Sequence, residues 1–269
     1  MFKADAAARI KSLLSCCVLL ASILTCPAAF GASDRRAECR AADADAQIIS
    51  CTQLIERGIR GTKRPLIAAY LSRGAAYRAK GELDPALADF DKALQLDPRS
   101  TRARRERALT YHALGEFDRA IADYSFVIVA QPQSASIFYE RGESYQAKNE
   151  PDRAIADYSK ALQLDKSLTS AYRGRAKAHL GKGDFDKALA DLDEAVKLDP
   201  RSASMLLDRG AIHLSTGDFD KAIADFDAAI AIDPLLAKAF LDRAASYRAK
   251  QDLEQARKDL EAALAIDPH

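Results

Sequence analysis

The chain has 269 residues, of which 48% are hydrophobic and 7% aromatic, with 12 Gly, 9 Pro and no Trp. Its abundant Ala, Leu, Asp, Lys and Arg favour helix over strand. The 40 Lys and Arg residues almost balance the 39 Asp and Glu residues, and the resulting net charge of +1 gives no indication of nucleic-acid binding.

Residues 1–31 have the composition of a secretory signal peptide. Three cations, Lys3, Arg9 and Lys11, precede an uncharged apolar run, and small residues follow that run. This order predicts an exported protein, periplasmic in a bacterium, with cleavage after Gly31.

Alternatives remain for this N-terminal segment. Cleavage after Ala28 would change only the mature N-terminus. The apolar run is shorter than the roughly 20 residues that a transmembrane helix needs, but an uncleaved segment could still hold the protein at a membrane, facing the periplasm. A lipid on Cys26 is disfavoured, because residues 23–25 lack the small residue that lipid-modification signals carry.

Export would leave Cys39 and Cys51 as the only cysteines of the mature chain. An even number of cysteines in an oxidising compartment predicts a disulfide; two buried free thiols are the alternative. The bond would close a loop of about a dozen residues and stabilise the fold by up to ~3 kcal/mol in the chain-entropy model.

Two nearly identical phrases, GDFDKALADLDEAVKLDP at 183–200 and GDFDKAIADFDAAIAIDP at 217–234, start 34 residues apart. Prolines recur at the same interval, except that Lys166 stands where one is expected. A fixed period of this length predicts a repeat architecture. Placing each proline at repeat position 32, counted from the first residue of a unit, gives six units: 67–100, 101–134, 135–168, 169–202, 203–236 and 237–269.

Each unit has the pattern of two helices joined by a turn. Position 20 is always Ala, position 8 is always Gly or Ala, and position 24 is bulky. Positions 4, 8 and 11 share one face of a first helix, and positions 20, 24 and 27 share one face of a second. Glycine at position 15 of four units indicates the turn.

This pattern resembles the tetratricopeptide repeat (TPR) family, which has a small residue at position 8, Ala at 20, an aromatic at 24 and Pro at 32. The resemblance covers residues 67–268 and departs most clearly at position 4, where Arg104 replaces a large apolar residue. It implies an all-α, right-handed superhelical solenoid of helix-turn-helix TPR units that binds other proteins. The first helices would line a concave groove.

The segment before the array has the same helical character. Laying Cys51 at position 24 makes residues 34–60 a degenerate first unit, whose two helices the disulfide would join. We therefore expect residues 32–66 to comprise this unit and a linker at 58–65.

Every unit carries Arg at position 7 and Asp at position 23. A surface that recognises one ligand needs differences between units, whereas a stacking joint needs the same parts at each junction. We therefore predict structural ion pairs, within a unit or between neighbours; a ladder of ligand-binding charges is the alternative. The residues are Arg73, Arg107, Arg141, Arg175, Arg209 and Arg243, with Asp89, Asp123, Asp157, Asp191, Asp225 and Asp259.

The last unit differs from the other five at two positions of its second helix. Positions 21 and 22 are apolar in the first five units, but are Arg257 and Lys258 in the last. Because terminal repeats need a polar outer face for solubility, we expect a polar end surface and a monomer.

The sequence contains no HExxH, GxSxG or phosphate-binding motif. His179 and His213 stand at position 11, which is Tyr in the other units, so we interpret them as packing residues rather than metal ligands. We expect a protein that is not an enzyme and binds no metal or cofactor. An accessory domain of an enzyme is an alternative.

By analogy with the family, positions 2, 5, 9 and 12 would face the groove, and there the chain has seven cations and one acid. Such a basic groove suits an extended segment with carboxylates or an acidic protein; an ordinary solvated face is the alternative. Acids at position 6 of four units border the groove and would weaken its field. The predicted partner-binding residues are Arg78, Arg102, Arg105, Tyr139, Arg173, Lys177, Lys238 and Arg248.

The sequence therefore predicts an exported scaffold or adaptor without catalytic activity, which binds a protein or peptide partner rather than nucleic acid. The alternative is a membrane-anchored envelope assembly or secretion factor, similar to a pilotin and held at the membrane by its N-terminus.

Overall fold

The computed structural model describes residues 39, 43–57 and 63–268. The predicted signal peptide and its cleavage site lie outside these residues. Within the described part of the chain all regular secondary structure is helical. None of these helices combines the length and the apolar character that crossing a bilayer requires.

Thirteen helices make up the described residues: α2 (Ala44–Glu56) and twelve helices that form six hairpins. The first helices of the hairpins are α3 (Arg64–Ala79), α5 (Thr101–Ala113), α7 (Ala135–Ala147), α9 (Thr169–Gly181), α11 (Ala203–Thr216) and α13 (Ala237–Ala249). The second helices are α4 (Leu83–Leu96), α6 (Phe117–Ala130), α8 (Pro151–Leu164), α10 (Phe185–Leu198), α12 (Phe219–Ile232) and α14 (Leu253–Ile266).

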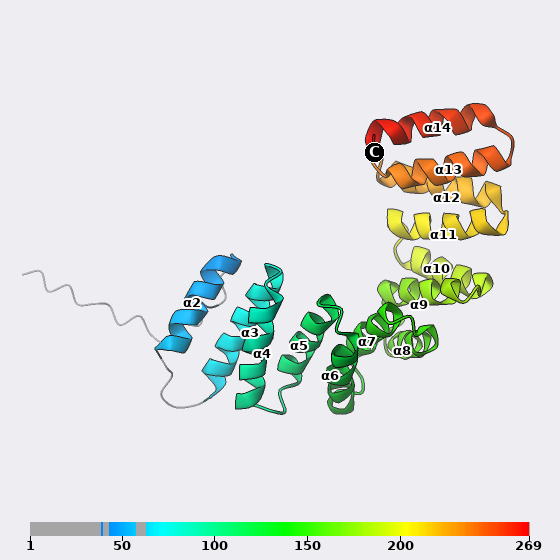
Figure 1. Ribbon diagram of the computed structural model, residues 1–269. Helices are drawn as coiled ribbons and strands as arrows, with labels where there is room; N and C mark the ends of the chain where they lie inside the picture. The colour runs from blue at the N-terminus through cyan, green and yellow to red at the C-terminus, as the bar shows by residue number, and fades with distance from the viewer. Residues whose placement is uncertain (1–38, 40–42, 58–62, 269) are drawn as a thin grey trace, which may run out of the picture.

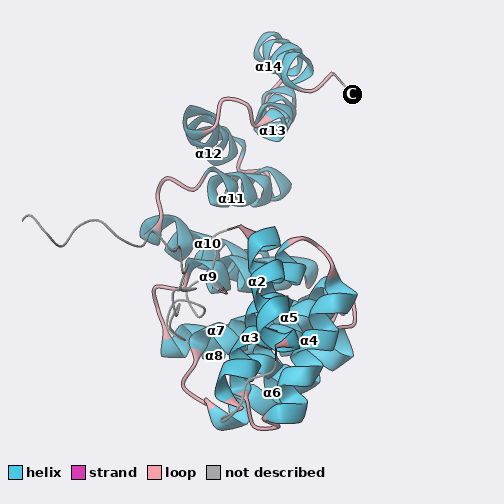
Figure 2. Cartoon of the chain, turned by 90° about the vertical axis from the view of Figure 1, so that its left-hand side faces the viewer, coloured by secondary structure: helices cyan, strands magenta, loops and turns pink. Residues whose placement is uncertain are grey.

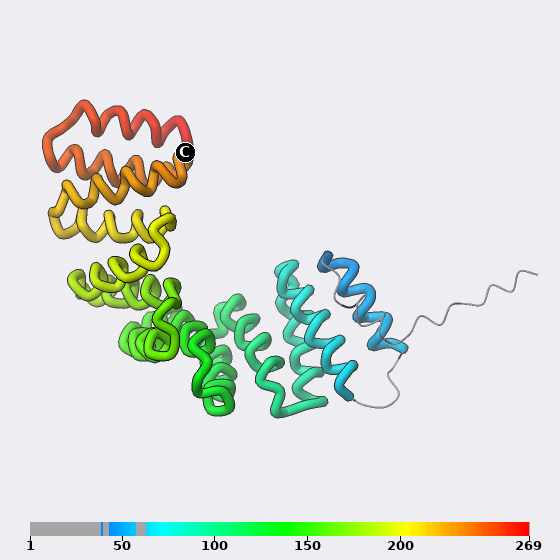
Figure 3. Tube along the Cα trace, turned by 180° about the vertical axis from the view of Figure 1, so that it is seen from behind, coloured from blue at the N-terminus to red at the C-terminus, as the bar shows by residue number. Residues whose placement is uncertain are grey.

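The hairpins stack side by side in chain order, so the two ends of the array lie far apart (Figure 1). Figure 3 shows the same succession from behind, and in Figure 2 α11 to α14 extend away from the other helices. The predicted all-α solenoid of helix-turn-helix units is confirmed.

The turn within each hairpin contains a residue in the left-handed region at position 15. Four units use glycine there, with φ between 77° and 84°, as the sequence pattern predicted. The third and sixth units use Asn149 and Gln251, with φ of 60° and 65°. The same turn therefore forms without glycine, although a side chain in this region costs roughly 1–2 kcal/mol.

Within a hairpin, the side chain at position 24 of the second helix fills the space above position 8 of the first helix. A Cβ added to Gly142 would lie 2.8 Å from the Tyr158 ring, and one added to Gly210 would lie 2.7 Å from the Phe226 ring. Glycine at these positions is therefore a packing requirement, because a methyl group would overlap the aromatic ring.

Arg104, the departure from the family pattern at position 4, is accommodated by its neighbours on α6. Its guanidinium lies 3.8 Å from the centre of the Phe126 ring and 3.3 Å from Asp123. A cation–π contact and an ion pair thus take the place of an apolar contact.

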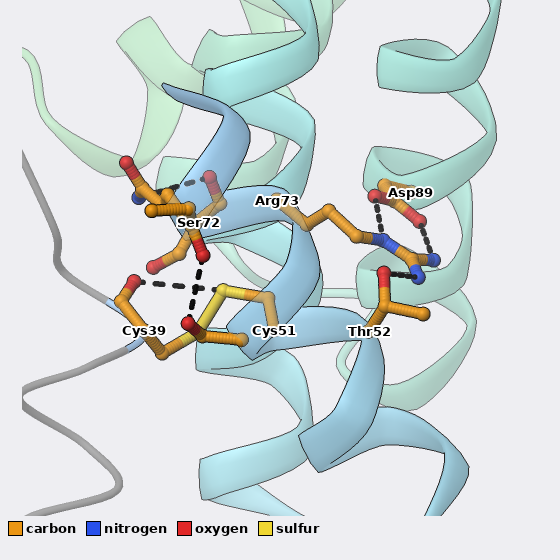
Figure 4. The surroundings of a disulfide bond; sticks show 9 residues. Cys39, Cys51, Thr52, Ser72, Arg73 and Asp89 are labelled. Carbon is orange, nitrogen blue, oxygen red and sulfur yellow. Dashed lines mark hydrogen bonds and ion pairs between the residues drawn. A yellow bond between two sulfur atoms is a disulfide. The ribbon is translucent and has the colours of Figure 1, made fainter. Parts of the chain in front are cut away.

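Helix α2 occupies the place of a second helix of an earlier unit. Arg73 Nη1 donates a hydrogen bond to Thr52 Oγ1 at 2.9 Å (Figure 4). Lys80 Nζ lies 2.6 Å from Asp45 Oδ1. With Cys51 at position 24, Thr52 and Asp45 stand at positions 25 and 18, which make equivalent contacts further along the array. The first helix expected for this unit lies outside the described residues, apart from Cys39.

The expected linker at 58–65 ends earlier than predicted. Helix α3 already begins at Arg64, with Pro65 in its first turn. Proline is tolerated at that point because the first turn of a helix has no intrahelical partner for its N–H groups.

The sulfur atoms of Cys39 and Cys51 lie at bonding distance, with their Cα atoms 5.1 Å apart (Figure 4). Both residues are buried, and Cys51 contacts Ala69 of α3. A bond here would tie the segment before α2 to α2 itself, which packs against α3 of the first complete hairpin.

The expected polar end surface is only partly present. Arg257 and Lys258 are exposed, but so are Leu260 and Leu264 on the same helix. Position 22, where Lys258 stands, is exposed in all six units, so a charge there does not alter the stacking face.

Candidate functional site

The arginine at position 7 makes the same set of contacts at all six junctions between consecutive units. Arg141 donates two hydrogen bonds to Asp157 of its own unit, at 2.7 and 2.8 Å, and a third to Ser125 of the preceding unit at 2.9 Å. All six arginines pair with the aspartate at position 23 of their own unit and contact position 25 of the second helix before it.

This arrangement confirms the structural interpretation of the Arg–Asp pattern. The pair holds the two helices of a hairpin together, and the third contact joins the hairpin to its neighbour. Burial is deep, since Asp157 is only 5% exposed. The Arg–Asp pattern therefore explains how the hairpins stack. Residues that contact a partner must be sought at other positions.

On the first helices, acids pair with most of the predicted groove cations. Three of these pairs join neighbouring units: Arg78 with Glu106 at 2.9 Å, Arg105 with Glu140, and Arg173 with Asp208 at 2.6 Å. A fourth, Lys238 with Asp242 at 2.9 Å, lies within α13.

Three predicted groove cations have no carboxylate within ion-pair distance among the described residues. Arg102, Lys177 and Arg248 are all exposed, on α5, α9 and α13 respectively. The positive charge available to a partner on this face is therefore concentrated in these three side chains.

Position 5 forms an ion pair with position 6 of the following unit at two of the five junctions between the six hairpins. Arg105 and Arg173, at position 5, pair with the acid at position 6 of the following unit. In the third unit position 5 is Tyr139, and the residue it faces at position 6 of the fourth unit is Gly174. A phenol and a glycine thus occupy these positions at the junction that lies between the two ion-paired ones.

A cavity of about 430 Å³ opens beside Tyr139 and Gly174. Tyr139 and Glu143 of α7 contribute to its lining, with Lys177 and Leu180 of α9 and Ile212 of α11. Of the predicted groove residues, the structure brings Tyr139, Arg173 and Lys177 together here, and leaves Arg78, Arg102, Arg105, Lys238 and Arg248 outside the cavity.

A hydrogen bond within the third unit holds Glu143 at the wall of the cavity. The Tyr158 hydroxyl donates to Glu143 Oε1, and a Cβ on Gly174 would lie 2.8 Å from the Tyr158 ring. Burial raises the pKa of the Tyr139 phenol, and the Glu143 carboxylate raises it further. Both effects keep that hydroxyl protonated at neutral pH.

One sequence feature indicates this cavity, although the groove prediction did not use it. Gly174 is the only glycine at position 6 of any unit. No sequence feature predicted that Ile212 lines the cavity, because position 10 is buried between hairpins in every unit.

The two histidines at position 11 lie near aspartates that begin the second helices. His179 Nδ1 is 3.5 Å from Asp184, and His213 Nδ1 is 3.7 Å from Asp218. Within the described ranges, no group of three or more His, Cys, Asp or Glu side chains has the arrangement of a metal site.

Solved structures of similar fold include MamA, with 26% identity over 62% of this chain and 92% of that one, and a TM-score of 0.58. YrrB, described as a TPR protein with an unusual peptide-binding site, has 24% identity, coverage of 66% and 92%, and a TM-score of 0.57. PilW, described as a type IV pilus biogenesis factor, has 20% identity, coverage of 76% and 94%, and a TM-score of 0.68. No curated protein matches the sequence.

Models of one repeat family match most of the array. Tetratricopeptide repeat models cover residues 67–100 and 135–168, residues 173–237, and residues 237–269. These ranges amount to more than half of the sequence and coincide with hairpins of the structure. The chain therefore belongs to the tetratricopeptide repeat family.

Proposed function

We propose that this protein is a scaffold whose concave face binds an extended, acidic segment of a protein partner. The TPR fold is an interaction scaffold, and proteins that carry it bind protein or peptide partners. The observation that carries the proposal is the cavity beside α9, which Tyr139 and Gly174 line and where Lys177 has no carboxylate within ion-pair distance among the described residues.

The cavity offers an anchor of mixed character. Leu180 and Ile212 supply apolar surface, the Tyr139 ring supplies an aromatic wall, and Lys177 supplies an ammonium group. An apolar side chain of the partner would enter the cavity while a neighbouring carboxylate pairs with Lys177.

An extended segment running along the first helices would meet the remaining free cations in turn. Arg102 lies on α5, two hairpins before α9, and Arg248 lies on α13, two hairpins after it. Carboxylates spaced along the segment would therefore gain contacts at several points, and the binding would weaken as salt screens them.

The test is photo-crosslinking of residues 32–269 in envelope extract, with a photoreactive phenylalanine analogue at Leu180 and, as matched control, at Val129 on α6. We expect a crosslinked partner at Leu180 only, and roughly tenfold less of it with Lys177→Glu. Lys92→Glu, an exposed charge reversal on α4, is the control for non-specific electrostatics. Equal crosslinking at both sites would place the partner elsewhere.

The ion pairs restrict which variants are informative. Arg105 and Arg173 pair with the following unit, so reversing their charges would weaken the junctions as well as the groove. Lys177→Glu and Arg102→Glu change the groove without breaking an ion pair among the described residues.

We also propose that the protein works in the cell envelope, based on its N-terminal sequence. The alternative is the membrane-anchored assembly factor; PilW, which shares the fold, is described as a pilus biogenesis factor. The intact mass of the purified natural protein tests both. We expect a mass that begins at residue 32 and is lower by the two hydrogens lost in a Cys39–Cys51 disulfide.

Three other masses would change this view. A retained segment 1–31, or a lipid on Cys26, would favour the membrane-anchored alternative. If an alkylating reagent adds two groups to the protein in denaturant without reductant, both cysteines are free and the disulfide is contradicted. Reduced protein is the control for complete alkylation.

A further inference from the structure

The second helix of each unit presents the same surface to the hairpin that follows it. Positions 24, 27 and 28 form its apolar part: Phe90, Ala93 and Leu94 cover Ala103 of the next unit. The equivalent residues cover Ile137, Ala171 and Ala239 at later junctions, and Cys51 covers Ala69 at the first. The side chain at position 24 is consequently no more than 2% exposed from Cys51 to Phe226.

The first helix that docks on this surface also uses the same positions each time. Positions 3 and 10 are buried in all six units and are Ala, Ser, Thr, Ile or Met. Position 7 is the arginine that reaches position 25, and position 14 is a lysine in four units. That lysine pairs with the aspartate at position 18, as Lys148 does with Asp118 at 2.6 Å.

Helix α14 carries this docking surface without a helix on it. Leu260 at position 24 is 46% exposed and Leu264 at position 28 is 62% exposed. The polar acceptors are present as well, with Glu261 at position 25 and Glu254 at position 18.

The two acidic acceptors on α14 are held only by exposed pairs within the same helix. Glu261 pairs with Arg257, and Glu254 pairs with Lys258. Exposed pairs of this kind contribute little to stability, so an incoming cation can replace them.

We propose that the exposed face of α14, formed by Glu254, Leu260, Glu261 and Leu264, docks an α-helix of a partner protein. The docking helix carries an arginine, a lysine seven residues after it, and small or apolar residues four before and three after the arginine. Six first helices of this chain present the arginine and the small or apolar residues to six equivalent surfaces, and four of them also present the lysine. The surface lies at the end of the array and is separate from the concave groove.

Among the described residues, a second copy of this chain offers no uncovered first helix. Each first helix among the described residues is already covered by the second helix that precedes it, and α3 is covered by α2 through Thr52 and Asp45. The proposal takes as occupant a helix of another protein, whose cations complement Glu254 and Glu261 and whose small or apolar residues fit Leu260 and Leu264.

The test uses a fluorescent peptide with the sequence of residues 135–148, the first helix of the third unit, added to residues 32–269. A lactam bridge between the positions of Ser136 and Glu140, away from the docking face, keeps it helical. We expect saturable binding by fluorescence anisotropy, at least ~10-fold weaker with Leu260→Asp because a charge then occupies the apolar centre.

A charge exchange separates specific docking from general hydrophobic adhesion. Glu261→Arg should weaken binding about tenfold, and a peptide with Glu at the position of Arg141 should bind this variant again. Leu260 and Glu261 are both exposed, so we expect their substitution to leave the fold intact. Thermal melting of each variant distinguishes a loss of folding from a loss of docking.

Two results would overturn the proposal. The first is an absence of binding at millimolar peptide, or binding that Leu260→Asp does not change. The second is a wild-type dimer in light scattering that Leu260→Asp converts to a monomer, since a second copy would then occupy the face.

Discussion

Arg141→Ala is expected to lower the free energy of unfolding by ~3–5 kcal/mol, the range for removing one partner of a buried ion pair. The arginine makes two hydrogen bonds to Asp157 and one to Ser125 of the preceding unit. Its loss leaves the buried Asp157 carboxylate without its cation and removes one contact between hairpins. Equilibrium unfolding in urea, followed by circular dichroism, measures the change.

Arg153→Ala is the matched control on the surface of the same unit. Arg153 pairs with Glu150 at 3.0 Å, and its side chain is 67% exposed. An exposed pair contributes between 0 and about 1 kcal/mol, so this variant should unfold almost like the wild type. Equal effects of the two substitutions would contradict the structural role of the Arg–Asp pairs. Arg141→Lys keeps the charge but cannot form the paired hydrogen bonds, and should be intermediate.

Leu192→Ala and Leu260→Ala change the same residue at the same repeat position, yet we expect very different results. Leu192 is 2% exposed, because the following hairpin covers it, and contacts Ile212 of that hairpin. Truncating a buried leucine costs about 2–5 kcal/mol. Leu260 is 46% exposed, so its truncation should cost less than about 1 kcal/mol.

Urea unfolding of the two variants under identical conditions tests this difference. Because an array of repeats unfolds through nearest-neighbour contacts, hydrogen exchange of α9 to α12 should also accelerate in Leu192→Ala and remain unchanged in Leu260→Ala. Similar losses of stability in both variants would mean that another molecule buries Leu260 in solution, and light scattering would then identify a dimer.

The regular features of this protein were accessible from the sequence because each depends on residues that recur every 34 positions. Small residues at position 8, Ala at position 20 and glycine at position 15 identify a hairpin through local geometry alone. The Arg–Asp pattern predicted an ion pair for the same reason, since both residues recur in every unit. Even the register of α2 followed from placing Cys51 at position 24.

What only the tertiary structure decided concerns contacts between units, where partners are far apart in the sequence. The sequence predicted Arg105 and Arg173 as groove cations available to a partner. In the structure they form ion pairs with Glu140 and Asp208 of the following units. The start of α3 at Arg64, inside the expected linker, likewise became known only from the structure.

The exposure of a side chain likewise depends on the presence of the next hairpin. Leu192 and Leu260 have the same place in the pattern, and only the stacking of α11 on α10 makes one buried and the other exposed. Repeat position determined which residues face a neighbouring helix. Whether a helix is there to cover them, and which charges remain free once hairpins pair, was decided by the assembled array, because burial and ion pairing are properties of surfaces in contact.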